Sequence, residues 1–319
     1  MRDIAMSVLH RPQQDILRFL PEGPCACGDN RLSWVAIQHG AEASCGSLNI
    51  YDFISETNTN YPLNGRPGFA CPTNQFNTFV VGLERRIVVV NLDSGEEIIV
   101  QDGVDAQVEG TIINDGLVFD RGLVFGTKDL ELTHPKASLY LWRRDDSQLV
   151  NLQSNQICSN GKVILGSGSE RTLLDIDSPR QTVVRYPFDV DAGTLGEPQI
   201  VVDLSDQGVF PDGMTATPDQ RSVIVAIYNP EPVPEGEVRQ YNIETGQLEC
   251  VWHTPGSPQV TCPQLVESRD GVKLVVTTAV ECMSAEAQKT AVNAGCLFLG
   301  ETDFESLPKP LYFELPSTH

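Results

Sequence analysis

Four acidic or amide side chains recur at one position of a repeated pattern in this sequence. They are Glu22, Asn114, Asn160 and Asp212, and a glycine follows each of them within two residues. Each stands nine to twelve residues before a run of β-forming residues. Carboxylate and amide oxygens are the ligands of hard divalent cations, and Ca²⁺ takes about six to eight of them. The set therefore predicts a site for one divalent metal ion, Ca²⁺ being favoured, with open positions for water or substrate.

Other interpretations of these residues stay open at this stage. Mg²⁺, Mn²⁺ and Zn²⁺ are alternative occupants, because sites made of oxygen ligands also accept them. Asn-Gly and Asp-Gly motifs also occur in turns, and a single such motif most often marks a turn and nothing more. Four such motifs at the same position of a repeat favour a binding site over four unrelated turns.

The elements that would position these residues form a repeat. Six pairs of β-forming runs follow one another, and equivalent points in them lie 39 to 59 residues apart. The pairs begin at Leu32, Thr78, Leu123, Thr172, Ser222 and Lys273. Polar turns that end in glycine, at 91–95 and 242–246, join a second run to another short strand, which is typical of a hairpin. This period predicts an all-β, six-bladed β-propeller of four-stranded antiparallel blades around a central channel, in a single domain over 1–319.

Two further elements are predicted for this ring. A serine at position 284, alanines after it and Gly295 indicate a short helix over 284–293, inserted between two strands of the last blade. The ring is expected to close through a strand near 6–10 together with residues 310–315.

Charge and composition exclude several classes of partner. The chain has 22 Lys and Arg against 43 Asp and Glu, a formal net charge of −21. Phosphate and anionic lipid are bound by clustered basic residues, which this chain lacks, so neither nucleic acid nor a membrane is expected as a partner. A small-molecule substrate is expected instead, and the sequence leaves open whether the protein is a monomer or a homo-oligomer.

The sequence also predicts a soluble, cytoplasmic protein. Charged and amide residues interrupt the apolar residues of positions 1–22, and no run of about 18 apolar residues follows. The nine cysteines form no regular framework, and the chain contains no Asn-x-Ser/Thr acceptor. Both observations favour a reducing compartment.

The words that carry this pattern resemble the senescence marker protein, regucalcin and gluconolactonase family, which includes luciferin-regenerating-enzyme-like proteins. The matching words lie at 21–24, 114–116, 126–131, 159–161, 211–214, 283–286 and 295–298. Pro211-Asp-Gly-Met214 and the order of the whole set are the specific features. The resemblance implies a six-bladed propeller hydrolase whose single divalent metal is held by Glu22, Asn160 and Asp212.

The same resemblance implies roles for other residues. Asn114 would contact substrate or a metal-bound water, Asp212 would also serve as the general base, and Glu131 would be a substrate-facing acid. The chain departs from the family at two places. Cys25-Ala-Cys27 stands where a tryptophan is usual, and Ile112 stands where sugar-lactone members often have an arginine. Ile112 is therefore expected to give the substrate site a more apolar wall.

The candidate metal site and the resemblance together imply a metal-dependent hydrolase that opens a small lactone, a sugar lactone or related ester, with metal-activated water. A bound cation polarises the carbonyl, and a carboxylate base contributes about 10²- to 10⁴-fold. Two alternatives stay open. One is hydrolysis of phosphotriesters or other organophosphates on the same scaffold, and the other is a non-catalytic, calcium-binding regulatory propeller.

Overall fold

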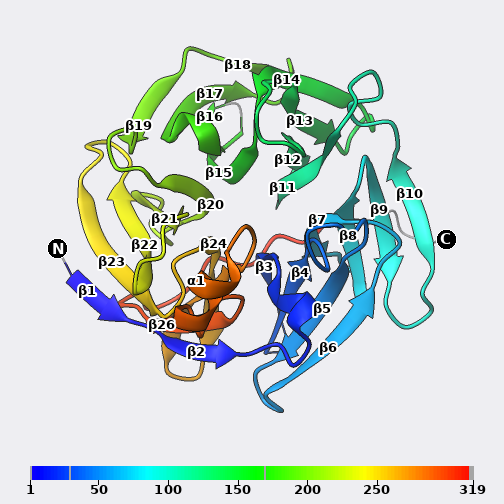
Figure 1. The fold of residues 1–319 in the computed structure, drawn as a ribbon. Coiled ribbons are helices and arrows are strands. Elements are labelled where there is room, and N and C mark those ends of the chain that lie inside the picture. Colours follow the sequence, from blue (N-terminus) through cyan, green and yellow to red (C-terminus); the bar gives the residue numbers. More distant parts are fainter. Residues whose placement is uncertain (1, 29, 169, 316–319) are drawn as a thin grey trace.

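The computed structural model describes residues 2–28, 30–168 and 170–315, and these residues form an almost entirely β-stranded structure. Six sheets stand side by side in a ring, and the first strand of each lies innermost, around a central channel (Figure 1). This arrangement confirms the predicted six-bladed β-propeller. The prediction of one domain over 1–319 includes positions 1, 29, 169 and 316–319, which lie outside the described residues.

The first three blades are regular four-stranded antiparallel sheets. The first contains β3 (Pro21–Gly28), β4 (Arg31–Ala36), β5 (Ser47–Asp52) and β6 (Thr57–Pro62). The second contains β7 (Pro67–Pro72), β8 (Thr78–Leu83), β9 (Arg86–Asn91) and β10 (Glu97–Gln101). The third contains β11 (Thr111–Phe119), β12 (Gly122–Asp129), β13 (Ala137–Arg143) and β14 (Leu149–Gln156).

The other three blades carry additions to the four-stranded plan. The fourth contains β15 (Ser159–Ser167), β16 (Glu170–Asp177), β17 (Thr182–Asp189), the short β18 (Thr194–Leu195) and β19 (Gln199–Asp203), with helix η2 (Ser178–Arg180) after β16. The fifth contains β20 (Phe210–Ala216), β21 (Ser222–Tyr228), β22 (Glu235–Asn242) and β23 (Leu248–Pro255), and β1 (Arg2–Ala5) lies parallel to β23 at its edge. The sixth contains β24 (Val260–Ser268), β25 (Gly271–Thr278), β26 (Leu297–Glu301) and β2 (Ser7–His10).

The structure shows where the repeated runs lie within a blade. The first run of each predicted pair is the second strand, as β4 and β12 illustrate, and the innermost strand comes before it. The four candidate residues therefore lie within innermost strands. The predicted turns at 91–95 and 242–246 do join third and fourth strands, β9 to β10 and β22 to β23.

Ring closure uses only one of the two predicted segments. β2 pairs antiparallel with β26, so a strand from the chain's beginning completes the sixth blade. Residues 310–315 instead run to the end of β7, where Phe313 forms a parallel bridge with Thr73 and its N–H donates to Pro72. The helix η1 (Asp15–Arg18) lies between β2 and the first blade.

The predicted helix is confirmed between the second and third strands of the last blade. It is α1 (Ala285–Thr290), and the Ser284 hydroxyl caps it by accepting from the Ala287 N–H at 3.1 Å. Figure 1 shows α1 in front of the ring, close to β24 and β3. The helix therefore lies over the end of the channel at which the inner strands begin.

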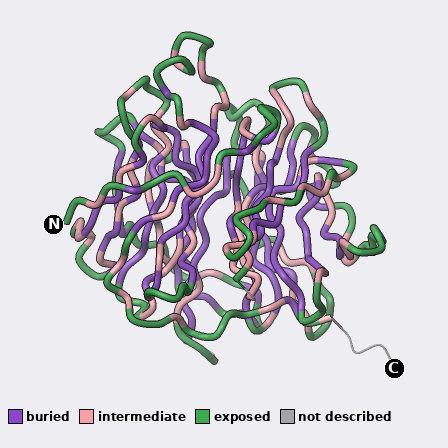
Figure 2. Tube along the Cα trace, turned by 90° about the horizontal axis from the view of Figure 1, so that it is seen from below, coloured by how far each residue is buried: buried purple, intermediate pink, exposed green. Residues whose placement is uncertain are grey.

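The hydrophobic core lies between neighbouring blades. One cluster joins Leu174 and Ile176 of β16 to Val223 and Val225 of β21, and all four side chains are fully buried. Figure 2 shows the same pattern for the whole ring, with buried strands between exposed loops at both ends. Burial of apolar surface contributes about 25 cal/mol per Å², so blade-to-blade packing holds the inner strands in fixed relative positions. None of the helices in the described residues is long and apolar enough to cross a membrane.

Candidate functional site

Each of the six inner strands is irregular near its beginning. The ladder with the second strand shifts register between Glu22 and Cys25 in β3, and between Ile113 and Gly116 in β11. Similar shifts occur near the beginnings of the other four, β7, β15, β20 and β24. A β-bulge leaves residues out of the ladder and re-aims their side chains. The bulges therefore explain why polar residues at this one level of the ring are free to face the channel.

Glycines after the candidate residues allow neighbouring inner strands to come close together. A Cβ atom added at Gly161 would lie 2.6 Å from the backbone oxygen of Asp212. One added at Gly213 would lie 2.5 Å from Cys262 Sγ. Such distances are far inside van der Waals contact, so only glycine fits at these positions. The glycines in the repeated words therefore serve the close approach of β15, β20 and β24.

A chain of hydrogen bonds links three inner strands at this level. Asn114 Nδ2 donates to Asn160 Oδ1 at 2.8 Å and to the Ser159 carbonyl at 3.1 Å. Asn160 Nδ2 donates to Ser178 Oγ at 2.9 Å, and that hydroxyl donates to the Pro211 carbonyl at 2.7 Å. Both amide groups are thereby fixed in orientation. We call Glu22, Asn114, Asn160 and Asp212 the oxygen cluster.

Two carboxyl groups of the oxygen cluster are buried, and no cationic side chain among the described residues is in hydrogen-bonding contact with either of them. Glu22 and Asp212 expose 8% and 7% of their surface. Glu22 Oε2 accepts from the Gly23 N–H at 2.9 Å, whereas Asp212 Oδ1 has no hydrogen-bond partner among the described residues. Burial raises the pKa of Glu22 to about 8, and the charge of Asp115 adds to this rise. Burial and the charge of Glu22 raise the pKa of Asp212 well above its ordinary value.

These observations fit a divalent cation. A cation held by Glu22 and Asp212 would offset the repulsion between their charges. It would also be coordinated by Asp212 Oδ1, which has no hydrogen-bond partner among the described residues. Within the described part of the chain no three His, Cys, Asp or Glu side chains are grouped so that they could hold a metal. A metal here would therefore be held by two carboxylates together with amide oxygen, as the sequence predicts.

Asp115 is a site residue that the sequence reasoning did not single out. Its carboxylate accepts from the Gly116 N–H at 2.7 Å, and its charge raises the pKa of both Glu22 and Asp212. Burial raises its own pKa as well. The sequence shows that Asp115 belongs to the Asn-Asp-Gly motif. It does not show the bulge that leaves two successive residues, Asn114 and Asp115, out of the ladder.

Three other residues close to the oxygen cluster were also missed. Lys128 lies near the end of β12, and its charge lowers the pKa of Glu22 and of Asp212. Glu281 lies in the segment after β25, where its carbonyl accepts from the Tyr228 hydroxyl at 3.2 Å. Cys158 receives weak contacts to its sulfur from the amide groups of Asn114 and Asn160. Nothing in the local sequence around these residues signals convergence, because they come from different blades.

The structure places the other two predicted substrate residues differently. Ile112 exposes 1% of its surface and stands opposite Lys128 in the ladder of β11 and β12. Glu131 lies in the turn after β12 with 73% of its side chain exposed, and its carboxylate is 3.9 Å from His134 Nδ1. Neither residue belongs to the hydrogen-bonded oxygen cluster, and their contact with substrate stays a prediction.

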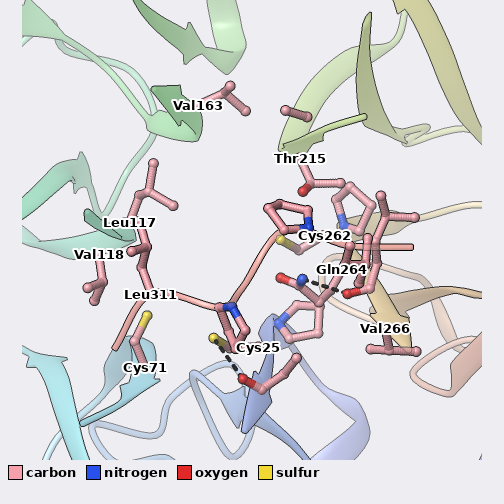
Figure 3. Close-up of a pocket in the computed structure, with 18 of the residues that line it drawn as sticks. Cys25, Cys71, Leu117, Val118, Val163, Thr215, Cys262, Gln264, Val266 and Leu311 are labelled. Atoms are coloured by element: carbon pink, nitrogen blue, oxygen red, sulfur yellow. Dashed lines mark hydrogen bonds between the residues drawn. The ribbon is translucent and has the colours of Figure 1, made fainter. Parts of the chain in front are cut away.

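A large cavity lies further along the channel, toward the ends of the inner strands. Its volume is about 690 Å³, and its walls include Cys25, Cys71, Leu117, Val118 and Leu311 (Figure 3). We call it the apolar cavity. The segment 307–311 lines its far side. The neighbouring Cys71 thiol and burial raise the pKa of Cys25 well above its ordinary value, so this thiol stays protonated near neutral pH. Asp115 and Lys162 also line this cavity, so it reaches the level of the oxygen cluster at one end.

The fold and the oxygen cluster define a six-bladed propeller with a candidate cation site in its channel. Residues 20–280 match the family described as SMP-30/Gluconolactonase/LRE-like region, and the chain belongs to that family. A putative sugar lactone lactonase, YvrE of Bacillus subtilis, is 28% identical over 186 residues, 56% of this chain and 57% of the relative. An uncharacterized protein of Sulfolobus acidocaldarius is 28% identical over 36% of this chain and 41% of its own length. The matches thus span roughly half the length of these relatives.

Solved structures show the same fold at low identity. The calcium-binding protein regucalcin of Agrobacterium tumefaciens has a TM-score of 0.79 at 18% identity, with 96% of this chain and 99% of that chain covered. A luciferin-regenerating enzyme has a TM-score of 0.78 at 18% identity, covering 93% and 95%. A gluconolactonase of Xanthomonas campestris has a TM-score of 0.64 at 15% identity, covering 92% and 88%. The likeness to these three structures concerns the fold.

Proposed function

We propose that the protein is a divalent-metal-dependent hydrolase that opens a small lactone. The observation that carries this proposal is the pairing of two buried carboxyl groups, Glu22 and Asp212, beside two amide groups fixed by hydrogen bonds. Burying two acids without a cation in contact is costly, and a structure retains such a pair where it has a use. Family membership and the sugar lactone lactonase relative support the choice of lactone as substrate.

The residues that would hold the metal are Glu22, Asn160 and Asp212, as the resemblance implies. When bound, a divalent ion supplies Lewis acidity, polarising a carbonyl and making water a better nucleophile. Ca²⁺ suits a set made only of oxygen ligands, and a calcium-binding protein with the same fold supports that choice. Mn²⁺, Mg²⁺ and Zn²⁺ are the alternatives that reconstitution would test.

The chain's own residues would divide the remaining work. Asp212 is the proposed general base, because the family resemblance implies that role and its Oδ1 has no hydrogen-bond partner among the described residues. Asn114 would orient the substrate through its amide, which the Ser159 carbonyl and Asn160 hold in place. Ser178 would keep Asn160 oriented as a ligand. Water attacks the lactone carbonyl, the ring C–O bond breaks, and the proton from water ends on the leaving alkoxide.

The experiment is a turnover assay on metal-stripped protein, with each of the four metals added back in turn. The substrate panel contains five- and six-membered lactones, aldonolactones and phosphotriesters. We expect lactone opening that needs added metal and is highest with the ion that binds tightest. Turnover of phosphotriesters alone would favour the organophosphate alternative. Tight metal binding without turnover of any compound would favour a regulatory, calcium-binding role.

A further inference from the structure

Lys128 is placed beside the oxygen cluster by two backbone contacts. It stands opposite Ile112 in the ladder of β11 and β12, and its backbone forms a bridge with Cys158, just before β15. The residue therefore lies where the third and fourth blades meet, close to the strand positions of Asn114 and Asn160. Cross-strand partners in an antiparallel ladder lie on the same face of the sheet, so the apolar Ile112 is its neighbour there.

The charge of Lys128 acts on both carboxyl groups of the oxygen cluster and on two nearby thiols. Its charge lowers the pKa of Glu22, Asp212 and Cys158, which come from three different blades or blade edges. It also lowers the pKa of Cys282, in the segment ahead of α1. Glu281, next to that cysteine, acts on the same acids with the opposite sign. The ammonium group is thus within electrostatic range of ionisable groups on β3, on β20 and in the segment after β25.

In the described part of the chain, no carboxylate lies close enough to Lys128 to neutralise its charge. Other lysines of the chain have such a partner: Lys136 Nζ is 2.9 Å from Asp129, and Lys162 Nζ is 3.6 Å from Asp175. Among the described residues, Lys128 has no ion pair within 4.0 Å, although it is half-buried. Half-burying an ammonium group without a partner is unfavourable, and Ile112 opposite it accepts no hydrogen bond. A negatively charged ligand would supply the missing partner.

We propose that Lys128 is a specificity-determining residue that binds a carboxylate group of the substrate, so that the protein prefers lactones bearing a carboxylate. This inference rests on the proposed function and names the substrate class for that site. A single ammonium group complements a monoanion, whereas a phosphate dianion would add one more charge beside Glu22, Asp115, Asp212 and Glu281. The lactone ring would then lie between Lys128 and the oxygen cluster.

The test compares a five-membered lactone that carries a ring carboxylate with its neutral methylamide. We expect kcat/KM to favour the carboxylate by about 10- to 100-fold, the range of a hydrogen bond between charged groups. Lys128→Met should remove that preference, mainly by raising KM for the carboxylate lactone, so that kcat/KM for the two lactones differs by no more than about twofold. Lys128→Arg should keep part of the preference. Lys289→Met is the matched control, at an exposed position of α1 where the lysine pairs with Glu286. It should leave kcat/KM unchanged for both lactones.

A second readout separates this inference from the proposed function. Calorimetric binding of both lactones to metal-loaded Asp212→Asn protein, with and without Lys128→Met, measures the preference without catalysis. Wild-type protein that opens no lactone would overturn the proposed function, while a carboxylate preference in binding that disappears with Lys128→Met would still support this inference. Equal losses on both substrates would show that Lys128 only tunes the acids, and unchanged values would show no role; either result overturns the proposal. Thermal unfolding of each variant checks that the fold is intact.

Discussion

The two halves of the channel are lined by the same six strands but differ in chemistry. Near the beginnings of the strands lie two buried carboxyl groups, Glu22 and Asp212, with two amide groups in fixed orientation. Further along, the same strands line the apolar cavity, whose walls include Leu117, Val118 and the thiols of Cys25 and Cys71 (Figure 3). The same six rigidly packed strands support both halves. The difference therefore comes from the local backbone and not from the fold.

The register shifts account for this difference. Every inner strand has one near its beginning. Regular pairing follows it, as at Gly116–Phe119 in β11 and Val163–Ser167 in β15, except in β3, where a second shift falls between Ala26 and Gly28. In a regular ladder, alternate side chains pack between blades. Residues at a bulge lie outside the ladder, so their side chains can face the channel instead. A propeller can thus build a polar site at one level of its channel without weakening the rest of the core.

The largest effect is expected from removing the base in the polar half. Asp212→Asn should lower lactone turnover by about 10²- to 10⁴-fold, because an amide cannot take a proton from water. Steady-state kinetics at saturating metal measures this loss. Asp206→Asn makes the same chemical change at an exposed position and should keep wild-type activity. Near-wild-type turnover by Asp212→Asn on every lactone would remove Asp212 from its assigned role.

A smaller effect is expected from the residue that orients Asn160. Ser178→Ala removes the acceptor of Asn160 Nδ2, and loss of such an outer contact typically weakens metal binding by about 10- to 100-fold. Metal titration by calorimetry measures the affinity. Ser205→Ala, at an exposed position, is the control. Equal affinity for Ser178→Ala and wild type would show that Asn160 needs no such support.

The pH dependence of stability should differ between metal-free and metal-loaded protein. The pKa of Glu22 is raised from 4.5 to about 8, so the folded state holds a proton there that the unfolded state has lost. In metal-free protein this group stabilises the fold fully below about pH 4.5, and that stability is lost as pH rises through 8. Saturating Ca²⁺ should reduce the loss, since it binds the ionised form. Thermal unfolding from pH 5 to 9 measures it, and Glu22→Gln should flatten the metal-free curve; an unchanged slope would contradict the assignment.

The smallest effect is expected in the apolar half. Cys71→Ala removes a buried thiol from the wall of the apolar cavity and should cost about 1 kcal/mol of unfolding free energy while leaving kcat within about twofold. Chemical denaturation and lactone kinetics measure the two quantities. A loss of activity close to that of Asp212→Asn would show that the two halves are not chemically separate.

Much of the fold was predictable because it repeats. The period of the β-forming runs, the turns at 91–95 and 242–246 and the cap at Ser284 each depend on local sequence. The inner strands were not recognised, since words such as Pro-Glu-Gly-Pro in β3 and Pro-Asp-Gly-Met in β20 contain residues that are poor strand formers. Their strand conformation is imposed by tertiary packing.

The candidate site was predictable only in part for a related reason. Glu22, Asn114, Asn160 and Asp212 share a phase of the repeat, so their convergence could be inferred from spacing. Asp115 and Lys128 share no such phase, and the bulge and the bridge that bring them to the cluster depend on contacts between strands. The register shifts and the bridge are properties of the assembled ring.

The central claim is that the oxygen cluster binds the divalent ion that lactone hydrolysis needs. Calorimetric titration of metal-stripped protein with Ca²⁺, on wild type and on the double variant Glu22→Gln with Asp212→Asn, tests it most directly. We predict one site per chain in wild type, no saturable binding in the double variant, and a thermal unfolding profile that shows the variant is folded. Equal binding by a folded double variant would contradict the claim.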